Sequence, residues 1–232
     1  MDKENTSSGL KFHELAEEAR EKDNHLEALK FIEEAIFNYQ KEKDHPSLVK
    51  AIQSRFLIYR HLFFLTKDQS YAILAQKDSE ASLSIAEKYN LTEIIGSSYF
   101  NLGKTAMLFK SYKEAIKQYE LAIEKYHGTN TEKGDYYYHL GEAFFKDNQK
   151  EKGKETILKG LKQIEDYADE VDPFLVHVWS SGCHIYLAKL LKEDNPQEAK
   201  ESFDKAKAII DSDDKLIIRK RQIKELAKDF EQ

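Results

Sequence analysis

Residues 99–126 read YFNLGKTAMLFKSYKEAIKQYELAIEKY, and this stretch predicts two helices joined by a short turn. Its first half carries large and small apolar residues at the i, i+3, i+4, i+7 spacing of one helix face. These residues are Tyr99, Leu102, Gly103 and Ala106. The second half has helical spacing of small and aromatic residues: Ala115, Tyr119, Ala122 and Tyr126. We expect a turn around Phe109-Lys110-Ser111, and we expect Gly103 to let the second helix approach closely.

The tripeptide Gly103-Lys104-Thr105 also looks like the end of a phosphate-binding P-loop, which would indicate a nucleotide-handling enzyme. Such a loop needs a second glycine five residues before Gly103, because its backbone amides must wrap the phosphates. Ser98 occupies that position, and the surrounding residues show a helical pattern where a buried strand should precede the loop. The spacing and the context therefore exclude a P-loop.

The two-helix pattern recurs on both sides of this stretch. Thirteen residues after Leu102 comes Ala115, and the same step leads from Leu140 to Gly153 in a downstream copy. The downstream copy consists of Tyr137, Leu140, Gly141, Phe144, Gly153, Ile157, Gly160 and Ile164. The upstream copy consists of Phe12, Leu15, Ala16, Ala19, Ala28, Ile32, Ala35 and Tyr39. Because a mid-helix glycine costs about 1 kcal/mol relative to alanine, Gly153 and Gly160 together predict unusually close packing.

With its Leu-Gly or Leu-Ala step and the small residues that follow, this unit resembles the tetratricopeptide repeat (TPR), a helix-turn-helix of about 34 residues. The resemblance is closest over 99–126 and good over 137–161. It implies an all-α, right-handed superhelical solenoid, here of five TPR-like hairpins and a C-terminal capping helix in a single domain, 1–232. We expect the hairpins at 7–41, 45–90, 92–127, 131–168 and 172–212, and the capping helix at 214–230.

Two of the five units depart from the motif. The second unit has two long helices, but the position thirteen residues before Ser79 falls at Thr66, in its expected turn. We expect this unit to keep the hairpin and lose the motif. In the fifth unit bulky Leu187 stands where a small residue belongs, whereas Pro196 is well placed to open the second helix.

The last expected helix combines an apolar side with a basic cluster. Its apolar residues are Leu216, Ile217, Ile223 and Leu226, and its basic residues are Arg219, Lys220, Arg221 and Lys224. Stacked repeats need a polar end cap, because the outer face of the terminal unit meets water. We expect the basic cluster to be the solvated face of that cap; contact with an acidic partner or nucleic acid is the alternative.

Composition excludes several classes of protein. The 232 residues carry a net charge of −6, whereas a general nucleic-acid binder needs a surplus of Lys and Arg. The most apolar run, 56–65, contains Arg60 and His61 and is too short to span a membrane. The first eight residues lack the apolar core of a secretory signal. We therefore expect a cytoplasmic protein with no membrane or nucleic-acid partner, in which Cys183, the single cysteine, is a small buried hydrophobe.

The candidate catalytic and metal-ligating residues do not form a recognisable site. His177 and His184 are seven residues apart and would share a helix face near Cys183, but no third or fourth ligand is defined. Cys183 and His184 are neighbours in sequence, so they project about 100° apart on a helix, which is wrong for a nucleophile and its base. We predict no catalytic residues, no metal and no cofactor, and hence no enzyme.

The TPR resemblance also implies where a partner binds, since the first helix of each unit lines a concave groove in this family. Matched position by position, it places seven side chains in the groove: Phe100, Asn101, Lys104, Tyr138, His139, Glu142 and His184. Aromatic and hydrogen-bonding side chains of this kind are common at binding hot spots. Some of them, Phe100 above all, could instead pack against the adjacent unit. The carboxylate clamp with which some TPR proteins bind chaperones is not reproduced at the equivalent positions.

Three hypotheses about function follow. The favoured one is a non-enzymatic scaffold that binds a protein or peptide partner in the groove, with its oligomeric state open. The alternative is a regulatory domain similar to the peptide-sensing repeat proteins of Gram-positive bacteria, which close on a short signalling peptide; the residues before Leu10 would leave no room for the usual N-terminal output domain. The third is an enzyme, which would gain support if His177, Cys183 and His184 converged with a carboxylate around a metal.

Overall fold

The computed structural model describes residues 7–230, and that part of the chain forms eleven α-helices and one 3-10 turn without any strand. Ten of the helices pair as five hairpins: α1 (Ser8–Glu21) with α2 (His25–Glu42), α3 (His45–Thr66) with α4 (Gln69–Lys88), α5 (Thr92–Leu108) with α6 (Tyr112–Lys125), α7 (Asn130–Lys146) with α8 (Lys150–Asp166), and α9 (Pro173–Leu191) with α10 (Pro196–Asp211). The 3-10 turn η1 (Ala168–Glu170) precedes α9, and α11 (Ile217–Ala227) ends the stack. The protein is an all-α repeat solenoid.

The first, third and fourth hairpins share one turn geometry. The second residue after the first helix of each adopts a left-handed conformation: Asp23 (φ 61°), Lys110 (φ 58°) and Asn148 (φ 67°). The amide of the next residue then bonds to the carbonyl five residues back, at 2.9 Å in all three: Asn24 to Ala19, Ser111 to Ala106, and Gln149 to Phe144. This is the Schellman helix ending, and its recurrence marks the repeat. The α3–α4 turn differs, because the left-handed residue Lys67 itself donates to the Phe63 carbonyl at 2.8 Å.

Glycines set the spacing inside the regular hairpins. A Cβ built on Gly103 would lie 2.5 Å from the Tyr119 ring, which confirms that Gly103 is a helix-packing contact. In the α7–α8 hairpin the contact is between backbones: a Cβ on Gly141 would lie 2.6 Å from the carbonyl oxygen of Gly153. One on Gly160 would lie 2.5 Å from the carbonyl oxygen of Gly134. The close packing predicted from Gly153 and Gly160 is thus confirmed.

The α3–α4 hairpin is held by polar contacts instead. The guanidinium of Arg55 donates to both carboxylate oxygens of Asp78, at 2.9 and 2.6 Å, and the Asp78 side chain is buried. Ser82 donates to Ser98 of the next hairpin at 2.9 Å, and Gln53 reaches the same Ser98 at 3.1 Å. The unit without the repeat motif therefore replaces small-residue contacts with buried hydrogen bonds.

The hydrophobic core runs along the stack as four successive clusters. The first lies in and between the α1–α2 and α3–α4 hairpins, and the second lies between the α5–α6 hairpin and α7. The third joins α7 and α8 to α9, and the fourth joins α9, α10 and α11. Each hairpin thus buries its apolar faces against its neighbours, as a solenoid requires. Among the described residues no helix combines the length and the apolarity that crossing a bilayer demands.

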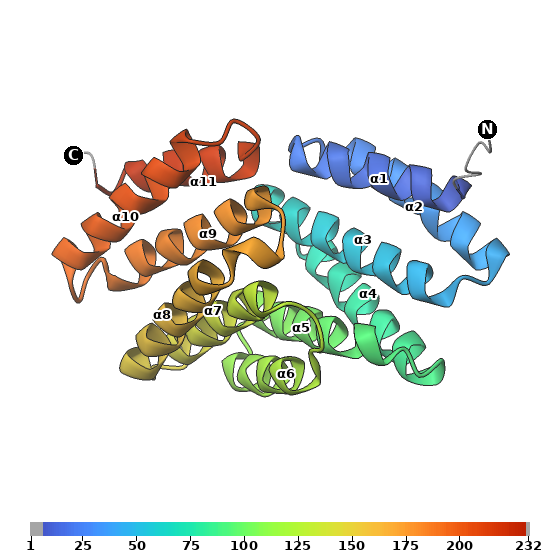
Figure 1. Ribbon diagram of the computed structural model, residues 1–232, viewed down its shortest axis with the longest axis horizontal. Coiled ribbons are helices and arrows are strands. Elements are labelled where there is room, and N and C mark those ends of the chain that lie inside the picture. Colours follow the sequence, from blue (N-terminus) through green and yellow to red (C-terminus); the bar gives the residue numbers. More distant parts are fainter. Residues whose placement is uncertain (1–6, 231–232) are drawn as a thin grey trace.

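The stack curves until α11 comes to lie next to α1 (Figure 1). The guanidinium of Arg221, on α11, donates to the carboxylate of Asp23, in the α1–α2 turn, at 2.8 and 3.1 Å. These two residues are 198 positions apart in sequence. The solenoid is therefore closed into a ring by a contact between its first and last elements.

The capping helix differs in two ways from the sequence-based expectation. Leu216, Ile223 and Leu226 are buried as predicted, but Ile217 is 41% exposed because it begins the helix on the side away from the stack. The basic cluster is not a purely solvated face. Arg221 pairs with Asp23, and the Arg219 guanidinium donates to the Val178 carbonyl at 3.1 and 2.9 Å.

Candidate functional site

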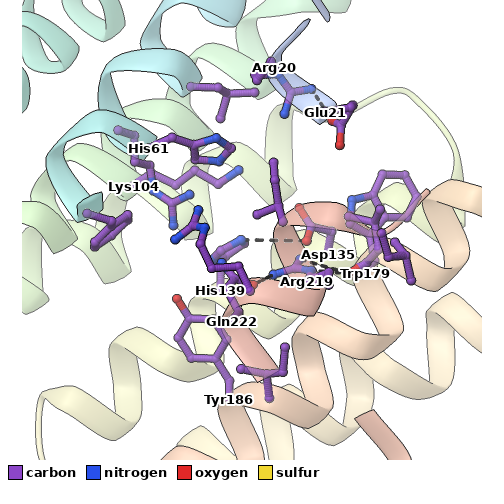
Figure 2. A pocket seen from close by; sticks show the side chains of 18 of the residues that line it. Arg20, Glu21, His61, Lys104, Asp135, His139, Trp179, Tyr186, Arg219 and Gln222 are labelled. Carbon is purple, nitrogen blue, oxygen red and sulfur yellow. Dashed lines mark hydrogen bonds and ion pairs between the residues drawn. The ribbon is translucent and has the colours of Figure 1, made fainter. Parts of the chain in front are cut away.

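The closed solenoid contains a cavity of about 390 Å³, which we call the central cavity. Its lining comes from α1, α3, α5, α7, α9 and α11 and from residues at their ends, so it includes the first helix of every hairpin and none of the second helices. Figure 2 shows Arg20, Lys104, His139, Tyr186 and Arg219 brought together around this space from five of these helices. The cavity is thus where the concave sides of all the units meet.

The cavity lining is strongly basic although the whole chain carries a net charge of −6. Its basic side chains are Arg20, Arg60, Lys67, Lys104, Lys189, Arg219 and Arg221. Its acidic side chains are Glu21, Asp135 and Glu225. Cavity walls of one predominant sign concentrate the field inside, so the interior attracts anions.

Three of the basic residues have their charge or donors satisfied within the protein. Arg20 contacts the carboxylates of Glu17 and Glu21 at 2.6 and 2.7 Å. Arg221 pairs with Asp23, and Arg219 is bound to the Val178 carbonyl. Gly182 makes that last contact possible, since a Cβ there would lie 2.8 Å from the Arg219 guanidinium.

The four other basic residues face aromatic rings instead of carboxylates. The Nζ of Lys104 lies 4.0 Å from the centre of the Phe100 ring, and the Cζ of Arg60 lies 5.0 Å from that of Phe64. The Nζ of Lys67 lies 5.7 Å from the Phe64 ring centre, and that of Lys189 lies 5.8 Å from the Tyr186 ring centre. Within residues 7–230, none of the four cations has a carboxylate oxygen within 4.0 Å. Burial lowers the pKa of Lys104 to about 8, in spite of the nearby charge of Asp135.

A second group of buried titratable side chains lies on α7. Burial raises the pKa of the Asp135 carboxyl to about 6 and that of the Glu142 carboxyl to about 7. His139 lies between them, with Nε2 3.8 Å from Asp135 Oδ1 and Nδ1 3.8 Å from Glu142 Oε2. Burial lowers the pKa of His139 well below its usual value, so its ring is neutral at pH 7. At pH 7 a carboxyl with a pKa of about 6 is mostly ionised, so the α7 side of the cavity combines the neutral His139 ring with negative charge from Asp135.

The structure brings three of the seven residues predicted for the groove into this cavity: Lys104, Tyr138 and His139. Glu142 is mostly buried one helical turn beyond His139, where the Tyr186 side chain contacts it. Phe100 is buried and stacks on Tyr136 with ring centres 3.8 Å apart, which is the packing role named above as its alternative.

The other two predicted residues do not line the cavity. Asn101 is buried on α5, next to Phe100 in sequence. His184 is buried on α9, where burial and the charge of Lys205 lower the pKa of its ring to about 4. Contact of any of the seven residues with a partner stays a prediction.

Sequence reasoning missed Arg60, Tyr186 and Arg219. Arg60 had a signal, because it interrupts the most apolar run of the chain, and a charge inside such a run needs an environment that solvates it. Tyr186 lies in the fifth unit, next to the position where the motif fails. Arg219 reaches the cavity only because the stack closes on itself, which no local pattern indicates.

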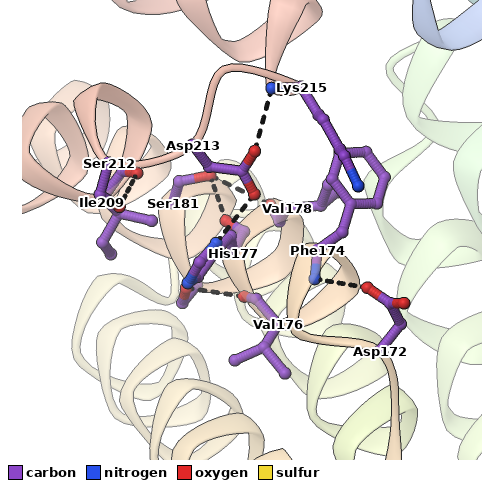
Figure 3. A network of polar contacts seen from close by, with 11 residues as sticks. Asp172, Phe174, Val176, His177, Val178, Ser181, Ile209, Ser212, Asp213 and Lys215 are labelled. Carbon is purple, nitrogen blue, oxygen red and sulfur yellow. Dashed lines mark hydrogen bonds and ion pairs between the residues drawn. The ribbon is translucent and has the colours of Figure 1, made fainter.

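Figure 3 shows that His177, on α9 of the fifth hairpin, takes part in a network of polar contacts with Asp213. His177 Nδ1 lies 3.0 Å from Asp213 Oδ2, and the backbone amide of Lys215 donates to the other oxygen of Asp213 at 2.9 Å. These bonds tie the α10–α11 turn to α9, while Cys183 is fully buried. Among the residues that the structure describes, no three His, Cys, Asp or Glu side chains are grouped as metal ligands.

Comparison with solved structures decides the fold family. TPR-like repeats of a putative kinesin light chain from Podosopora anserina match with a TM-score of 0.57 and 17% identity, over 88% of this chain and 96% of that chain. This chain has the TPR-like repeat fold. The apo form of RapI matches with a TM-score of 0.67 and 14% identity, over 99% of this chain and 86% of that chain. BtubC from P. vanneervenii matches with a TM-score of 0.51 and 17% identity, over 91% of this chain and 92% of that chain.

Sequence comparison adds nothing to these structural matches, since no family model and no curated protein matches the chain. At such identities the likeness concerns the fold alone. The TPR-like fold explains why the first helix of every hairpin lines the central cavity. It does not explain the cations of that cavity, which belong to this chain's own sequence.

Proposed function

We propose that this protein is a non-enzymatic interaction module of the cytoplasm that binds a peptide segment of a protein partner in the central cavity. The observation that carries the proposal is the convergence of five hairpins and the last helix on one cavity. Its lining combines aromatic rings with cations that have no carboxylate partner in the residues described. Aromatic and basic side chains together are typical of binding hot spots.

The rings of Tyr138, His139 and Tyr186 form an aromatic wall of the cavity, in which Tyr138 and His139 are buried and Tyr186 is partly exposed. Tyr138 stacks on His139 with ring centres 4.0 Å apart, and Tyr186 lies 5.4 Å from Tyr138. Such a wall gives contact area at low cost in conformational entropy, because aromatic side chains have few rotatable bonds. The neutral His139 and the hydroxyls of the two tyrosines add donors and acceptors, with which the backbone of a bound peptide can form hydrogen bonds.

The proposal is tested by selecting peptides from a random library on the purified protein and measuring their affinity by fluorescence anisotropy. Tyr138→Leu removes part of the aromatic wall and should weaken a selected peptide about ten-fold or more. Tyr137→Leu is the matched control, since Tyr137 is the next residue of α7 and does not line the cavity. Peptides that bind both variants as well as the wild type would place the site elsewhere, and circular dichroism checks that both variants fold.

A second candidate function is a peptide-sensing regulatory domain. The ion pair between Asp23 and Arg221 favours it, because a ring closed around the cavity offers two states, open and closed, that a ligand could shift. Spin labels on α2 and α10 would report the two states by their separation. A selected peptide that leaves the distribution of separations unchanged would argue against sensing, though not against binding.

A further inference from the structure

Arg60 and Lys104 are two cations of the central cavity that have no direct carboxylate partner among the described residues. Both are partly buried, and the Nζ of Lys104 contacts the face of Phe100 at 4.0 Å. Arg60, on α3, has a similar aromatic neighbour, the Phe64 ring, whose centre lies 5.0 Å from the Arg60 Cζ. The two positive charges also lie close enough that Arg60 further lowers the pKa of Lys104, after the larger effect of burial. The charge of Asp135 acts in the opposite direction and more strongly than that of Arg60, but among the described residues no carboxylate oxygen lies within 4.0 Å of either cation, which leaves room for a closer anion.

The cation–aromatic contact alone does not explain this arrangement. Lys152 and Lys159, on α8, lie over Phe144 and Tyr137 at 3.7 and 3.8 Å, and both lysines are exposed to water. Water solvates the ammonium groups there, whereas in the cavity the protein partly shields Lys104 and Arg60 from water. A buried charge without an ion-pair partner destabilises a protein, and removing water strengthens its attraction for an added anion. The cavity pair therefore has the properties of a binding site for an anion from outside the fold.

The one carboxyl of the cavity near these cations is Asp135, on α7. It is buried, and it lies beyond 4.0 Å from both Lys104 and Arg60. Its nearest recorded ionisable neighbour is His139, at 3.8 Å. Asp135 thus offsets part of the positive potential without forming an ion pair with either basic side chain.

We propose that Arg60 and Lys104 form an anion subsite that binds a carboxylate of an acidic peptide segment. The inference rests on the function proposed above, and it adds the chemical class of the ligand: a segment with Asp or Glu side chains, or with a free C-terminal carboxylate. The guanidinium of Arg60 can bind a carboxylate through two parallel hydrogen bonds, and the Lys104 ammonium adds a point charge. The aromatic wall on α7 and α9 then contacts the rest of the segment.

The test uses the purified full chain and labelled peptides with amidated ends: hexaglutamate, hexaglutamine and hexalysine. Hexaglutamate should bind at least ten-fold more tightly than the other two. Hexaglutamine with a free C-terminus distinguishes the source of the carboxylate, since tight binding of this peptide would assign the subsite to a chain terminus. If hexaglutamine or hexalysine binds as well as hexaglutamate, the anion subsite is wrong while peptide binding in the cavity still holds.

Variants then locate the binding. Arg60→Gln and Lys104→Met should each weaken hexaglutamate about ten-fold or more, the loss expected for one charge-assisted contact. Arg60→Lys should retain more affinity than Arg60→Gln, because it keeps the charge. Lys159→Gln is the matched control: it removes an aromatic-stacked lysine outside the cavity and should leave the affinity within about two-fold. Equal losses for Lys159→Gln and Lys104→Met would show non-specific attraction and would overturn the proposal.

A measurement without any ligand gives an independent test. If Lys104 is an unpaired cation kept for an anion, Lys104→Met should raise the midpoint of thermal unfolding, because methionine fills the same space without a buried charge. A lysine that stabilises the free fold would give the opposite result. A lowered midpoint for Lys104→Met would therefore show an internal partner for its ammonium and would sink the anion subsite, whatever the peptide-library selection finds.

Discussion

The α7–α8 and α3–α4 hairpins occupy equivalent places in the stack and are held together in different ways. In α7–α8, glycines bring two helix backbones into contact, with Gly141 facing Gly153. In α3–α4, longer helices are joined by the buried pair of Arg55 and Asp78. The Schellman turn is present in the first of these hairpins and absent from the second. One superhelical arrangement thus tolerates both close backbone contact and polar pairing, provided that neighbouring hairpins still bury each other's faces.

The two hairpins also differ in whether their buried carboxyls have a cationic partner. Burial raises the pKa of Asp78 as well as those of Asp135 and Glu142. Asp78 has the Arg55 guanidinium at hydrogen-bonding distance, but neither carboxyl on α7 has such a partner in the described residues. The polar pair of α3–α4 therefore serves the fold, whereas the uncompensated groups of α7 lie at or beside the cavity, where a ligand can complete them.

Gly141→Leu would disrupt the glycine-packed hairpin, and of the substitutions considered it should lower the free energy of unfolding the most. A Cβ at this position already lies 2.6 Å from a carbonyl oxygen and 2.7 Å from the Ile157 amide nitrogen, so the two backbones would have to separate. We expect the free energy of unfolding to fall by about 3 kcal/mol or more, at the upper end for overpacking. Gly182→Ala is the control, because its Cβ meets the movable end of Arg219, and it should change stability by less than about 1 kcal/mol. Urea unfolding measures both.

Arg55→Met would break the polar-packed hairpin and should have a smaller effect. It leaves the Asp78 carboxyl buried without its cation, at an expected cost of about 2 to 3 kcal/mol, somewhat below the range for a fully buried pair because Arg55 is partly exposed. Arg55→Met with Asp78→Leu removes both charges and should recover at least half of that loss. A double variant that is as unstable as the single one would mean that the pair contributes net stability, and that the two hairpins are alike in needing their specific contacts.

Glu142→Gln should change the free energy of unfolding the least, and the size of the change should depend on pH. Burial raises the pKa of Glu142 from 4.5 to about 7 in the folded protein. Between these values the unfolded chain has lost the proton while the folded protein keeps it, so stability from this group is lost as pH rises from about 4.5 to about 7. Glutamine does not titrate, and the variant should gain at least about 1 kcal/mol relative to wild type between about pH 5 and pH 7.5. A constant difference across this range, measured by urea unfolding, would mean that Glu142 is ionised throughout.

Much of the architecture could be predicted because it depends on local spacing. The positions of Gly103 and Gly141 relative to the next helix follow from helical geometry and the length of a two-helix unit, and the structure shows the contacts they imply. The second unit was expected to form a hairpin without the motif, and α3 and α4 form one. Its buried pairing of Arg55 with Asp78 carries no spacing signal, since the two residues lie on different helices.

The central cavity was only partly predictable because it depends on how far the stack curves. Lys104 and His139 were found from their motif positions, which point to the concave side in any TPR-like unit. Arg60 lies in the unit without the motif, where position counting fails. Arg219 comes from the capping helix, which reaches the cavity only after the five hairpins have turned far enough for the ends to meet. The accumulated rotation is a sum of small inter-unit angles that the sequence does not display.

The contact between Asp23 and Arg221 adds an interaction between the two ends of a solenoid that is otherwise built from contacts between neighbouring hairpins. An open stack of repeats unfolds from either end, and the loss of one terminal unit leaves the far terminus undisturbed. Here the ends contact each other, so fraying of α1 removes a partner of α11, and the reverse. An ion pair of this exposure contributes at most about 1 kcal/mol, so its loss should loosen both termini by a small amount. A chain built from nearest-neighbour contacts thereby acquires one long-range contact between its two ends.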